Sequence, residues 1–190
     1  ANISFKKGNK RIAFDICAAN ILLNYLAQKA DLSFDKGGQL GKQGKVNSEL
    51  LEKLNSLDFF NQQPPKSLGR EWLEKEVLPL FKNSKLSLHD QLRTAYEHIA
   101  IQISKSVKNQ EKGKLLATGG GALNSFLIEL LKRKSYHEIH IPKNQIIDFK
   151  EALIFAFLGV LRWRNEVNCL SSVTGAIRGS SGGSIFTHSK

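Results

Sequence analysis

A triple glycine between an apolar run and an amphipathic segment is the feature of this sequence best suited to binding a charged ligand. Residues 114–118 lead directly into Gly119, Gly120 and Gly121, and apolar residues then recur at helical spacing. Residues without Cβ let the backbone approach a ligand closely, and a helix amino terminus adds N–H donors. The same glycines would equally serve a tight strand-to-helix turn. They match neither a P-loop nor a dinucleotide fingerprint, because the lysine and the spacing are missing.

Two further groups of polar residues could face an anion or a metal ion. Asp15 ends a predicted strand and Asn20 begins the next helix, an arrangement that suits a metal or phosphate but in isolation is more often a helix cap. Lys66, Ser67 and Arg70 surround a turn that leads into a helix, and they could position an anion. A capped helix with surface charges explains these three residues equally well.

The remaining reactive side chains carry no recognisable site. The histidines lack metal-ligand spacing, since His137 and His140 would point to opposite faces of a strand, and no nucleophile motif is present. Cys17 and Cys169 do not pair by spacing, and we expect both to be reduced thiols. We treat all of these residues as non-catalytic.

Segments with the hydrophobic period of a strand alternate along the chain with segments that have the period of a helix. This alternation predicts an α/β fold, which would position these groups. A hairpin over residues 3–16 precedes a helix from residue 18, and residues 31–46 are too glycine-rich for regular structure. Three helices follow, near residues 47–60, 69–81 and from 88 onwards, the last behind a Ser87–Asp90 capping box. A buried strand over residues 114–118, a helix after the glycines, a strand near 139–141 and a helix over 152–161, buried on most faces, complete the pattern.

Composition indicates one globular, cytoplasmic domain. The chain has 190 residues, of which 41% are hydrophobic and 24% charged. Its longest apolar run, residues 152–161, is far shorter than the roughly 20 residues a membrane helix needs, and no signal peptide opens the chain. The net charge of +11 would attract an anionic ligand, but the basic residues are dispersed without interleaved aromatics, which argues against nucleic acid. Residues 179–183, rich in Gly and Ser, should be flexible.

The motifs together, in their order along the chain, resemble the carboxy-terminal half of the anhydro-N-acetylmuramic acid kinases, sugar kinases of the actin-like and Hsp70-like ATPase superfamily. Residues 1–3 resemble the end of the family's Asn-Ile-Gly-Gly-Ile-Ala-Asn strand, and residues 14–20 resemble its Tyr-Asp-Thr-Gly-Pro-Gly-Asn segment. The other matching segments are residues 34–37 with 44–47, 64–67 with 69–71, 119–124, 151–153 with 155–158, and 172–176. The resemblance covers essentially the whole chain.

The resemblance implies one RNase H-like lobe, a mixed β-sheet with helices packed on it, whose partner lobe closes over MgATP and the sugar. In this family water opens the 1,6-anhydro bond while the γ-phosphoryl group passes to O6, giving N-acetylmuramic acid 6-phosphate in peptidoglycan recycling. By resemblance, Gly119, Gly120 and Gly121 back the adenosine with Asn124 nearby. Asp15, Asn20 and Asn2 face the phosphates, Mg²⁺ or the cleft, while Lys66, Ser67, Arg70 and Thr174 position groups near it. The family also tends to form homodimers.

Two departures from the family pattern bear on activity. The amino-terminal half, with its phosphate loop and water-activating aspartate, lies outside this chain, so we expect no catalytic residue here and no turnover by this chain alone. In addition, the family's Thr-Gly-Pro-Gly is replaced by residues 16–19, Ile-Cys-Ala-Ala, which put side chains where glycines allow close approach. A diverged relative that binds nucleotide without catalysis, or serves as an interaction domain, is therefore the alternative.

Overall fold

Alternating apolar residues at the start of the chain build a β-hairpin. The structure, a computed structural model, describes residues 1–186. Strand β1 (Asn2–Lys7) pairs antiparallel with β2 (Lys10–Asp15), with Ile3 opposite Phe14. Gly8 in the connecting turn has φ of 56°, which a residue without Cβ adopts at little cost. The predicted hairpin is confirmed, and it delivers Asp15 at its carboxyl end.

Most of the helices follow the predicted hydrophobic periods, but two short ones, Gln39–Gln43 and Ser171–Thr174, were not predicted. The helices are α1 (Asn20–Ala27), α2 (Gln39–Gln43), α3 (Ser48–Asn55), α4 (Arg70–Trp72), α5 (Leu78–Lys82), α6 (Leu88–Val107), α7 (Ser125–Lys134), α8 (Asn144–Trp163) and α9 (Ser171–Thr174). A π-helical segment, Leu73–Val77, joins α4 to α5 into the continuous helix expected there. Short 3-10 segments are Gln28–Ala30, Lys36–Gly38, Asp58–Asn61 and Gly120–Leu123.

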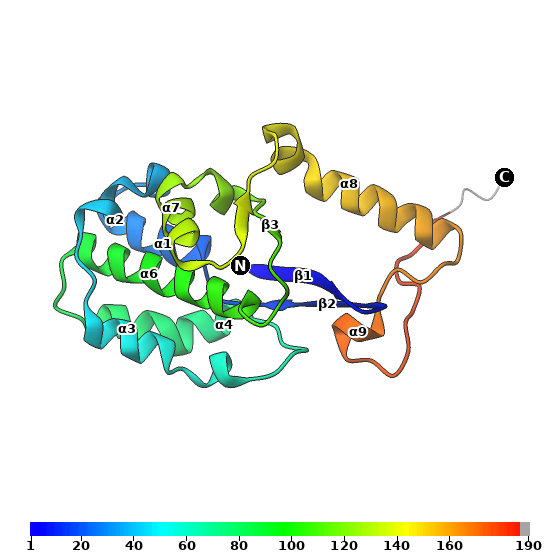
Figure 1. Ribbon diagram of the computed structural model, residues 1–190, viewed down its shortest axis with the longest axis horizontal. Helices are drawn as coiled ribbons and strands as arrows, with labels where there is room; N and C mark the ends of the chain where they lie inside the picture. Colours follow the sequence, from blue (N-terminus) through cyan, green and yellow to red (C-terminus); the bar gives the residue numbers. More distant parts are fainter. Residues whose placement is uncertain (187–190) are drawn as a thin grey trace.

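Helix α6 is the centre of the hydrophobic core. Its residues Leu92, Ala95, Tyr96 and Ile99 are fully buried. Helices α1, α2, α3 and α7 all pack against it, as Figure 1 shows. Burial of this one long amphipathic helix by its neighbours therefore stabilises the body.

The strands form two separate sheets, whereas one mixed sheet was expected. Strand β3 (Lys114–Leu116) pairs in parallel with β4 (Glu138–His140), and no ladder joins β3 to β1 within the described part of the chain. The prediction that residues 114–118 form a buried strand is also wrong in part. Leu115 is half-buried and Leu116 is 56% exposed, because successive side chains of a strand point to opposite faces and Leu115 is the one that packs against the core.

Two local predictions around residues 31–46 and 87–90 need correction. The glycine-rich segment is not irregular throughout, because Lys36–Gly38 and α2 lie in it. Ser87 caps α6 by accepting the Asp90 amide (3.2 Å), but the Asp90 carboxylate accepts the Lys45 amide (2.6 Å) instead of completing a capping box. The hydrogen bond between Lys45 and Asp90 thereby joins the 31–46 segment to the start of α6.

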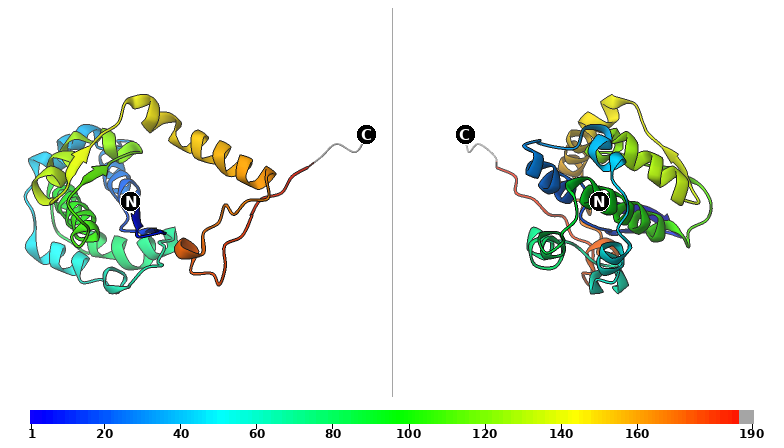
Figure 2. Two further views of the ribbon diagram at one scale, coloured as in Figure 1. Left: turned by 45° about the vertical axis from the view of Figure 1, so that its right-hand side comes forward. Right: turned by 90° about the vertical axis from the view of Figure 1, so that its left-hand side faces the viewer.

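Helix α8 is the largest departure from expectation. Residues 152–161 were predicted to be buried on most faces, yet Leu153, Phe155 and Phe157 are each at least 60% exposed. Figures 1 and 2 show the reason: α8 leaves the body after β4 and projects away from it, so most of its apolar surface meets no other element. Over residues 1–186 the structure contains no helix both long and apolar enough to cross a membrane.

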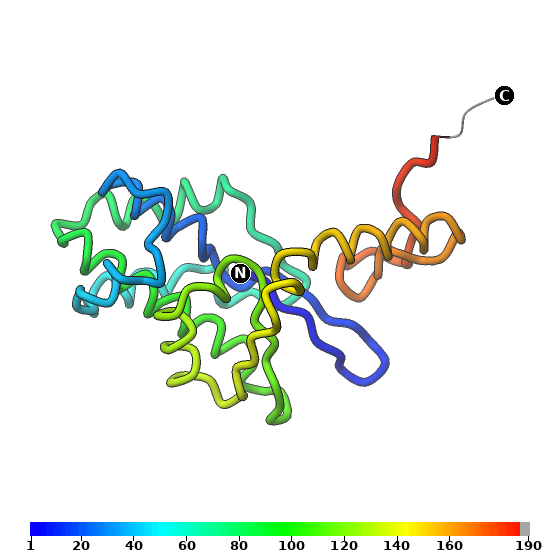
Figure 3. The backbone as a smooth tube through the Cα atoms, turned by 90° about the horizontal axis from the view of Figure 1, so that it is seen from above, coloured from blue at the N-terminus to red at the C-terminus, as the bar shows by residue number. Residues whose placement is uncertain are grey.

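The chain after α8 folds back towards the hairpin. Helix α9 packs against β2, where the Ser172 hydroxyl donates to the Arg11 carbonyl (2.7 Å). Residues 179–183 make several hydrogen bonds, including the bridge between Cys169 and Ser180. Their flexibility stays a prediction. In Figure 3 the hairpin and α8 extend from the same side of the body.

Candidate functional site

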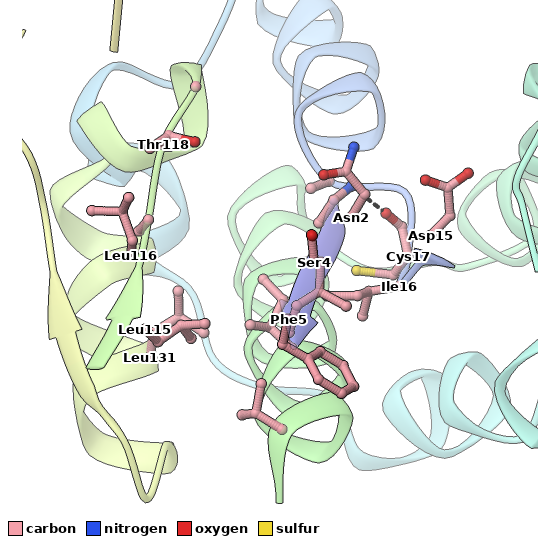
Figure 4. A pocket seen from close by; sticks show the side chains of 18 of the residues that line it. Asn2, Ser4, Phe5, Asp15, Ile16, Cys17, Leu115, Leu116, Thr118 and Leu131 are labelled. Carbon is pink, nitrogen blue, oxygen red and sulfur yellow. Dashed lines mark hydrogen bonds between the residues drawn. The ribbon is translucent and has the colours of Figure 1, made fainter. Parts of the chain in front are cut away.

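A cavity of about 1340 Å³ separates the hairpin from β3 and the glycine loop. One end of it gathers the groups singled out in the sequence: Asn2 and Asp15 from the hairpin, Asn20 from α1, and the three glycines, residues 119–121. Figure 4 shows Asn2, Asp15 and Thr118 at this end of the cavity. The fold therefore brings together segments that lie far apart in the sequence.

The glycine loop is shaped by one residue that needs its glycine. Gly119 has φ of 75°, in the region that L side chains rarely adopt, and its carbonyl accepts the Ala122 amide (2.9 Å) to start the 3-10 segment. The Asn20 side chain lies against the next two glycines. A Cβ built on Gly120 would be 3.1 Å from Asn20 Nδ2, and one on Gly121 would be 3.4 Å from Asn20 Oδ1. The loop thus presents bare backbone beside a carboxamide.

Asp15 is held in place by the segment before α4. Its backbone amide donates to the Lys66 carbonyl (3.1 Å), and its Oδ2 accepts the Leu68 amide (2.8 Å). Within residues 1–186 its Oδ1 has no hydrogen-bond partner. One carboxylate oxygen is therefore fixed and the other is available at the cavity end.

The amino terminus of α1 opens on the same end of the cavity. Ala19 at the N-cap position offers no side-chain acceptor, and Ala18, Ala19, Asn20 and Ile21 all line the cavity. Such an uncapped terminus leaves backbone N–H groups for an anion. Cys17, just before it, is buried, and burial raises the pKa of its thiol to about 12, so the thiol stays protonated.

Lys150 is a candidate site residue that the sequence reasoning missed. It comes from α8, and its Nζ donates to the Thr118 hydroxyl (2.8 Å) at the cavity beside the glycine loop. The lysine therefore places a positive charge near the strand-to-glycine junction. Its position depends on where α8 leaves the body, for which no local pattern gives a signal.

Four of the proposed site residues do not line this cavity. Lys66 turns away from it: its Nζ donates to the Phe59 carbonyl (3.0 Å) and lies over the Phe59 ring. It lines a separate cavity of about 240 Å³, and partial burial lowers the pKa of its ammonium group from the usual value. Ser67 is exposed, and Thr174 lies on α9, where its hydroxyl donates to the Leu170 carbonyl (3.2 Å).

Arg70 does line the cavity, but its Nε forms an exposed ion pair with Glu74 (2.7 Å).

The fourth residue outside the cavity, Asn124, caps α7. Its Oδ1 accepts the Leu127 amide (3.1 Å), and its Nδ2 donates to the Tyr96 hydroxyl (2.7 Å). Both ends of the Asn124 side chain are thus engaged in holding α7 in place.

The bond from Asn124 belongs to a buried network that sequence reasoning did not find. The Tyr96 hydroxyl donates to Asp35 Oδ2 (3.2 Å), and the Asp35 carboxylate also accepts the Leu40 and Gly41 amides (2.9 and 3.0 Å). Burial, followed by the nearby Asp35 charge, raises the pKa of Tyr96. The network ties the 31–46 segment to α6 and α7, and hence supports the start of the helix that follows the glycine loop.

The donor set at the cavity end suits Mg²⁺ held through a phosphate more than a closed metal centre. In the part of the chain that the structure describes, no three His, Cys, Asp or Glu residues are placed to hold a metal ion together. A single carboxylate, Asp15, is nevertheless the type of ligand that Mg²⁺ combines with water and substrate phosphates.

The fold and cavity define a mixed α/β protein with a glycine-lined ligand cleft. A family model described as anhydro-N-acetylmuramic acid kinase matches residues 1–188. This chain belongs to the anhydro-N-acetylmuramic acid kinase family.

Three relatives that carry this family's name are similar to the chain. One from Sulfurovum sp. (strain NBC37-1) is 34% identical over 94% of this chain and 51% of its own length. Those from Sulfurimonas denitrificans and Mannheimia succiniciproducens are 32% and 33% identical, over 91% and 98% of this chain and 50% and 54% of their own lengths. The chain therefore spans about half the length of the curated relatives it matches.

Proposed function

We propose that this chain is the carboxy-terminal, nucleotide-side lobe of an ATP-dependent kinase that converts 1,6-anhydro-N-acetylmuramic acid to N-acetylmuramic acid 6-phosphate. The observation that carries the proposal is the meeting of Asp15, Asn20 and the glycine loop at one end of a single cavity. Family membership supplies the reaction. The RNase H-like description of the lobe, its cytoplasmic location and a homodimer stay predictions that follow from the resemblance.

We assign the adenosine to the side of the cavity formed by Gly120 and Gly121, which we call the glycine wall. Gly120 and Gly121 offer a surface without side chains, and Asn20 beside them offers both a donor and an acceptor. Such a flat wall with one carboxamide suits a purine or ribose, which needs close approach and a few directed hydrogen bonds.

The phosphates are assigned to the uncapped start of α1. Backbone N–H groups there favour an anion, and Lys150 adds a positive charge nearby. Asp15 would repel a bare phosphate, so its open Oδ1 is assigned to Mg²⁺, with Asn2 facing the same space. Bound Mg²⁺ would neutralise phosphate charge, while Leu68 keeps the carboxylate oriented.

The sugar and the attacking water are assigned to the other half of the protein. Phosphoryl transfer depends on positioning and charge stabilisation from both sides of the transferred group. We assign the nucleotide side to this chain, and we assign no catalytic acid or base to any of its residues.

A transfer assay tests the proposal. The chain joined to the remaining half of the Sulfurovum relative should transfer the labelled γ-phosphoryl group of ATP to 1,6-anhydro-N-acetylmuramic acid, whereas each half alone should not. A folded two-lobed protein without turnover would contradict the proposal.

A second candidate function is nucleotide binding without catalysis. Residues 16–19 line the cavity with side chains where the family has Thr-Gly-Pro-Gly. Against this, Ile16, Cys17 and Ala19 are buried, so only Ala18 of the four is even half-exposed. The double variant Ala18→Gly with Ala19→Gly, made in the joined two-lobed protein, distinguishes the two functions. Transfer activity that appears only in the double variant would assign the natural chain to the non-catalytic class.

A further inference from the structure

The smaller cavity, of about 240 Å³, lies apart from the candidate nucleotide site. Its walls come from the end of α3, the last turns of α6, β2 and residues 60–64, and Figure 1 shows α3 and α6 packed side by side. Of the residues that line it, only Ile16 also lines the larger cavity. A ligand bound here would therefore not occupy the space assigned to the nucleotide.

Two carboxamides give the smaller cavity a fixed donor and a fixed acceptor. Gln102 is only 5% exposed, and its Nε2 donates to Asn55 Oδ1 (2.7 Å), which also lies 2.8 Å from His98 Nδ1. Within residues 1–186 neither Gln102 Oε1 nor Asn55 Nδ2 has a hydrogen-bond partner. Neither atom is enclosed by protein, so both reach open space, and both residues line this cavity.

The smaller cavity carries positive charge. Lys66 and Lys105 line it, whereas none of its lining residues is an aspartate or a glutamate. The Lys66 ammonium group donates to the Phe59 carbonyl (3.0 Å), which leaves two of its three N–H donors available. Lys105 is exposed and forms no ion pair with any residue that the structure describes. Two ammonium groups without a carboxylate partner attract an anion.

The volume of the smaller cavity limits the size of its ligand. A protein cavity of about 150 Å³ holds benzene, and drug-sized ligands occupy about 300–1,000 Å³. The smaller cavity lies between these limits and suits a compound of about ten non-hydrogen atoms. Phe14 and Phe60 provide apolar wall for its carbon atoms.

We propose that the smaller cavity binds a small hydroxylated dianion, in which either two carboxylates or one phosphate carry the charge. Its anionic groups lie near Lys66 and Lys105, an anionic oxygen accepts from Asn55 Nδ2, and its hydroxyl group donates to Gln102 Oε1. A neutral sugar would leave both ammonium groups without a counter-charge. An anion without a hydroxyl group would leave the Gln102 oxygen unpaired, which costs free energy at a buried side chain.

The proposed site does not depend on the proposed kinase activity, and its test needs no nucleotide. Two pairs of compounds test it by isothermal titration calorimetry of this chain. L-malate and glycerol 3-phosphate carry the hydroxyl group, and succinate and propyl phosphate are their analogues without it. The hydroxylated member of at least one pair should bind about tenfold more tightly than its analogue. The pair that binds more tightly identifies the charged group as carboxylate or phosphate.

Nuclear magnetic resonance locates the bound compound. The side-chain amide signals of Asn55 and Gln102 should shift on addition of the tighter ligand, because both carboxamides contact it. The backbone signals of Gly119, Gly120 and Gly121, which line only the larger cavity, should stay in place.

A charge-removing variant tests the contribution of the lysines. Lys105→Gln should weaken binding of the tighter ligand about tenfold, because it removes one of the two positive charges. Lys108→Gln is the matched control: Lys108 is also an exposed lysine at the end of α6, but it lines neither cavity. This control should leave the affinity unchanged.

A second variant tests the hydroxyl contact. Gln102→Leu should weaken binding of the hydroxylated compound about tenfold and leave the affinity for its analogue unchanged, because only the hydroxyl group pairs with Oε1. A loosened fold would instead weaken both compounds equally. The ratio of the two affinities therefore separates the contact from a structural effect.

Four results would overturn the proposal. They are no binding of any of the four compounds at about 10 mM, shifts confined to the glycines of the larger cavity, equal affinities of the two lysine variants, and an equal loss for both members of a pair in Gln102→Leu.

Discussion

The side-chain amide of Asn20 lies directly beside Gly120, so that a Cβ on the glycine would come within 3.1 Å of Asn20 Nδ2. The two residues belong to elements far apart in the sequence, the start of α1 and the loop after β3. Their contact is the point where the hairpin half and the glycine half of the candidate site meet.

Gly120→Ala should weaken MgATP binding about tenfold, because the added methyl group presses on Asn20 and fills the glycine wall. Isothermal titration calorimetry measures the affinity. Gly159→Ala is the matched control: it lies in exposed α8 with nothing within 4 Å of a new Cβ. This control should stabilise the fold by about 0.5–1 kcal/mol and leave affinity unchanged. If the Gly120→Ala variant and the parent bind MgATP with equal affinity, adenosine does not bind against Gly120 and Gly121.

Asp15→Asn should abolish most of the Mg²⁺ dependence of ATP binding. The amide oxygen can still accept the Leu68 amide, so the fold is retained, but the negative charge that attracts the cation is lost. Titrations with and without Mg²⁺ give the comparison. Asp31→Asn serves as the control, since Asp31 is exposed and has φ of 57°, which asparagine tolerates. Undiminished Mg²⁺ dependence in the Asp15 variant would assign the cation elsewhere.

Tyr96→Phe should lower the free energy of unfolding by about 1–3 kcal/mol. The hydroxyl joins buried Asp35 to Asn124, so its removal leaves a carboxylate and an amide short of one partner each. The phenyl ring keeps its packing against Phe126. Urea denaturation measures the loss. Tyr25→Phe is the control: Tyr25 is half-buried and its hydroxyl has no hydrogen-bond partner among the described residues, so the free energy of unfolding should change by less than ~0.5 kcal/mol.

His98 should make stability depend on pH below neutrality. Burial, with a smaller contribution from Lys105, lowers its pKa from 6.5 to about 4. Its Nδ1 lies 2.8 Å from Asn55 Oδ1, which also accepts the Gln102 amide (2.7 Å), so the neutral ring donates from Nδ1. The unfolded chain therefore binds the extra proton first as pH falls.

The stabilisation from neutral His98 is complete above about pH 6.5 and is lost progressively as pH falls towards 4, by up to about 3 kcal/mol. Chemical denaturation across this range should show the loss in the parent chain. His98→Gln, which can still donate to Asn55, should show a smaller slope with pH. Identical slopes would show that His98 is not kept neutral by burial.

Local patterns were sufficient to predict the hairpin and most helices, and they singled out polar residues and glycines that meet at one end of the larger cavity. Asp15, Asn20 and the glycines each stand at a junction between elements, where a change of hydrophobic period marks the boundary. Lys66 was harder to place, because sequence shows that a lysine follows the turn but not that its Nζ folds back onto the Phe59 carbonyl.

Contacts between residues far apart in the sequence could not be predicted from local patterns. Asp35 and Tyr96 meet only when α2, α6 and α7 pack together, and Lys150 reaches Thr118 only through the direction of α8. The burial predicted for residues 152–161 was wrong. An apolar sequence indicates that a helix face tends to be covered, but it does not show whether another element of the same chain covers it. The single mixed sheet failed for a similar reason, since strand order depends on strands that pair across distant parts of the chain.

Nuclear magnetic resonance mapping of a non-hydrolysable MgATP analogue on this chain tests the central claim most directly. Amide signals of Asp15, Asn20, Gly119, Gly120 and Gly121 should shift with a common dissociation constant. Signals of Gln62 and Lys66, at the smaller cavity, should stay in place. Shifts confined to the smaller cavity, or no shifts at the glycine loop at saturating analogue, would contradict the assignment of this lobe as the nucleotide side of a kinase.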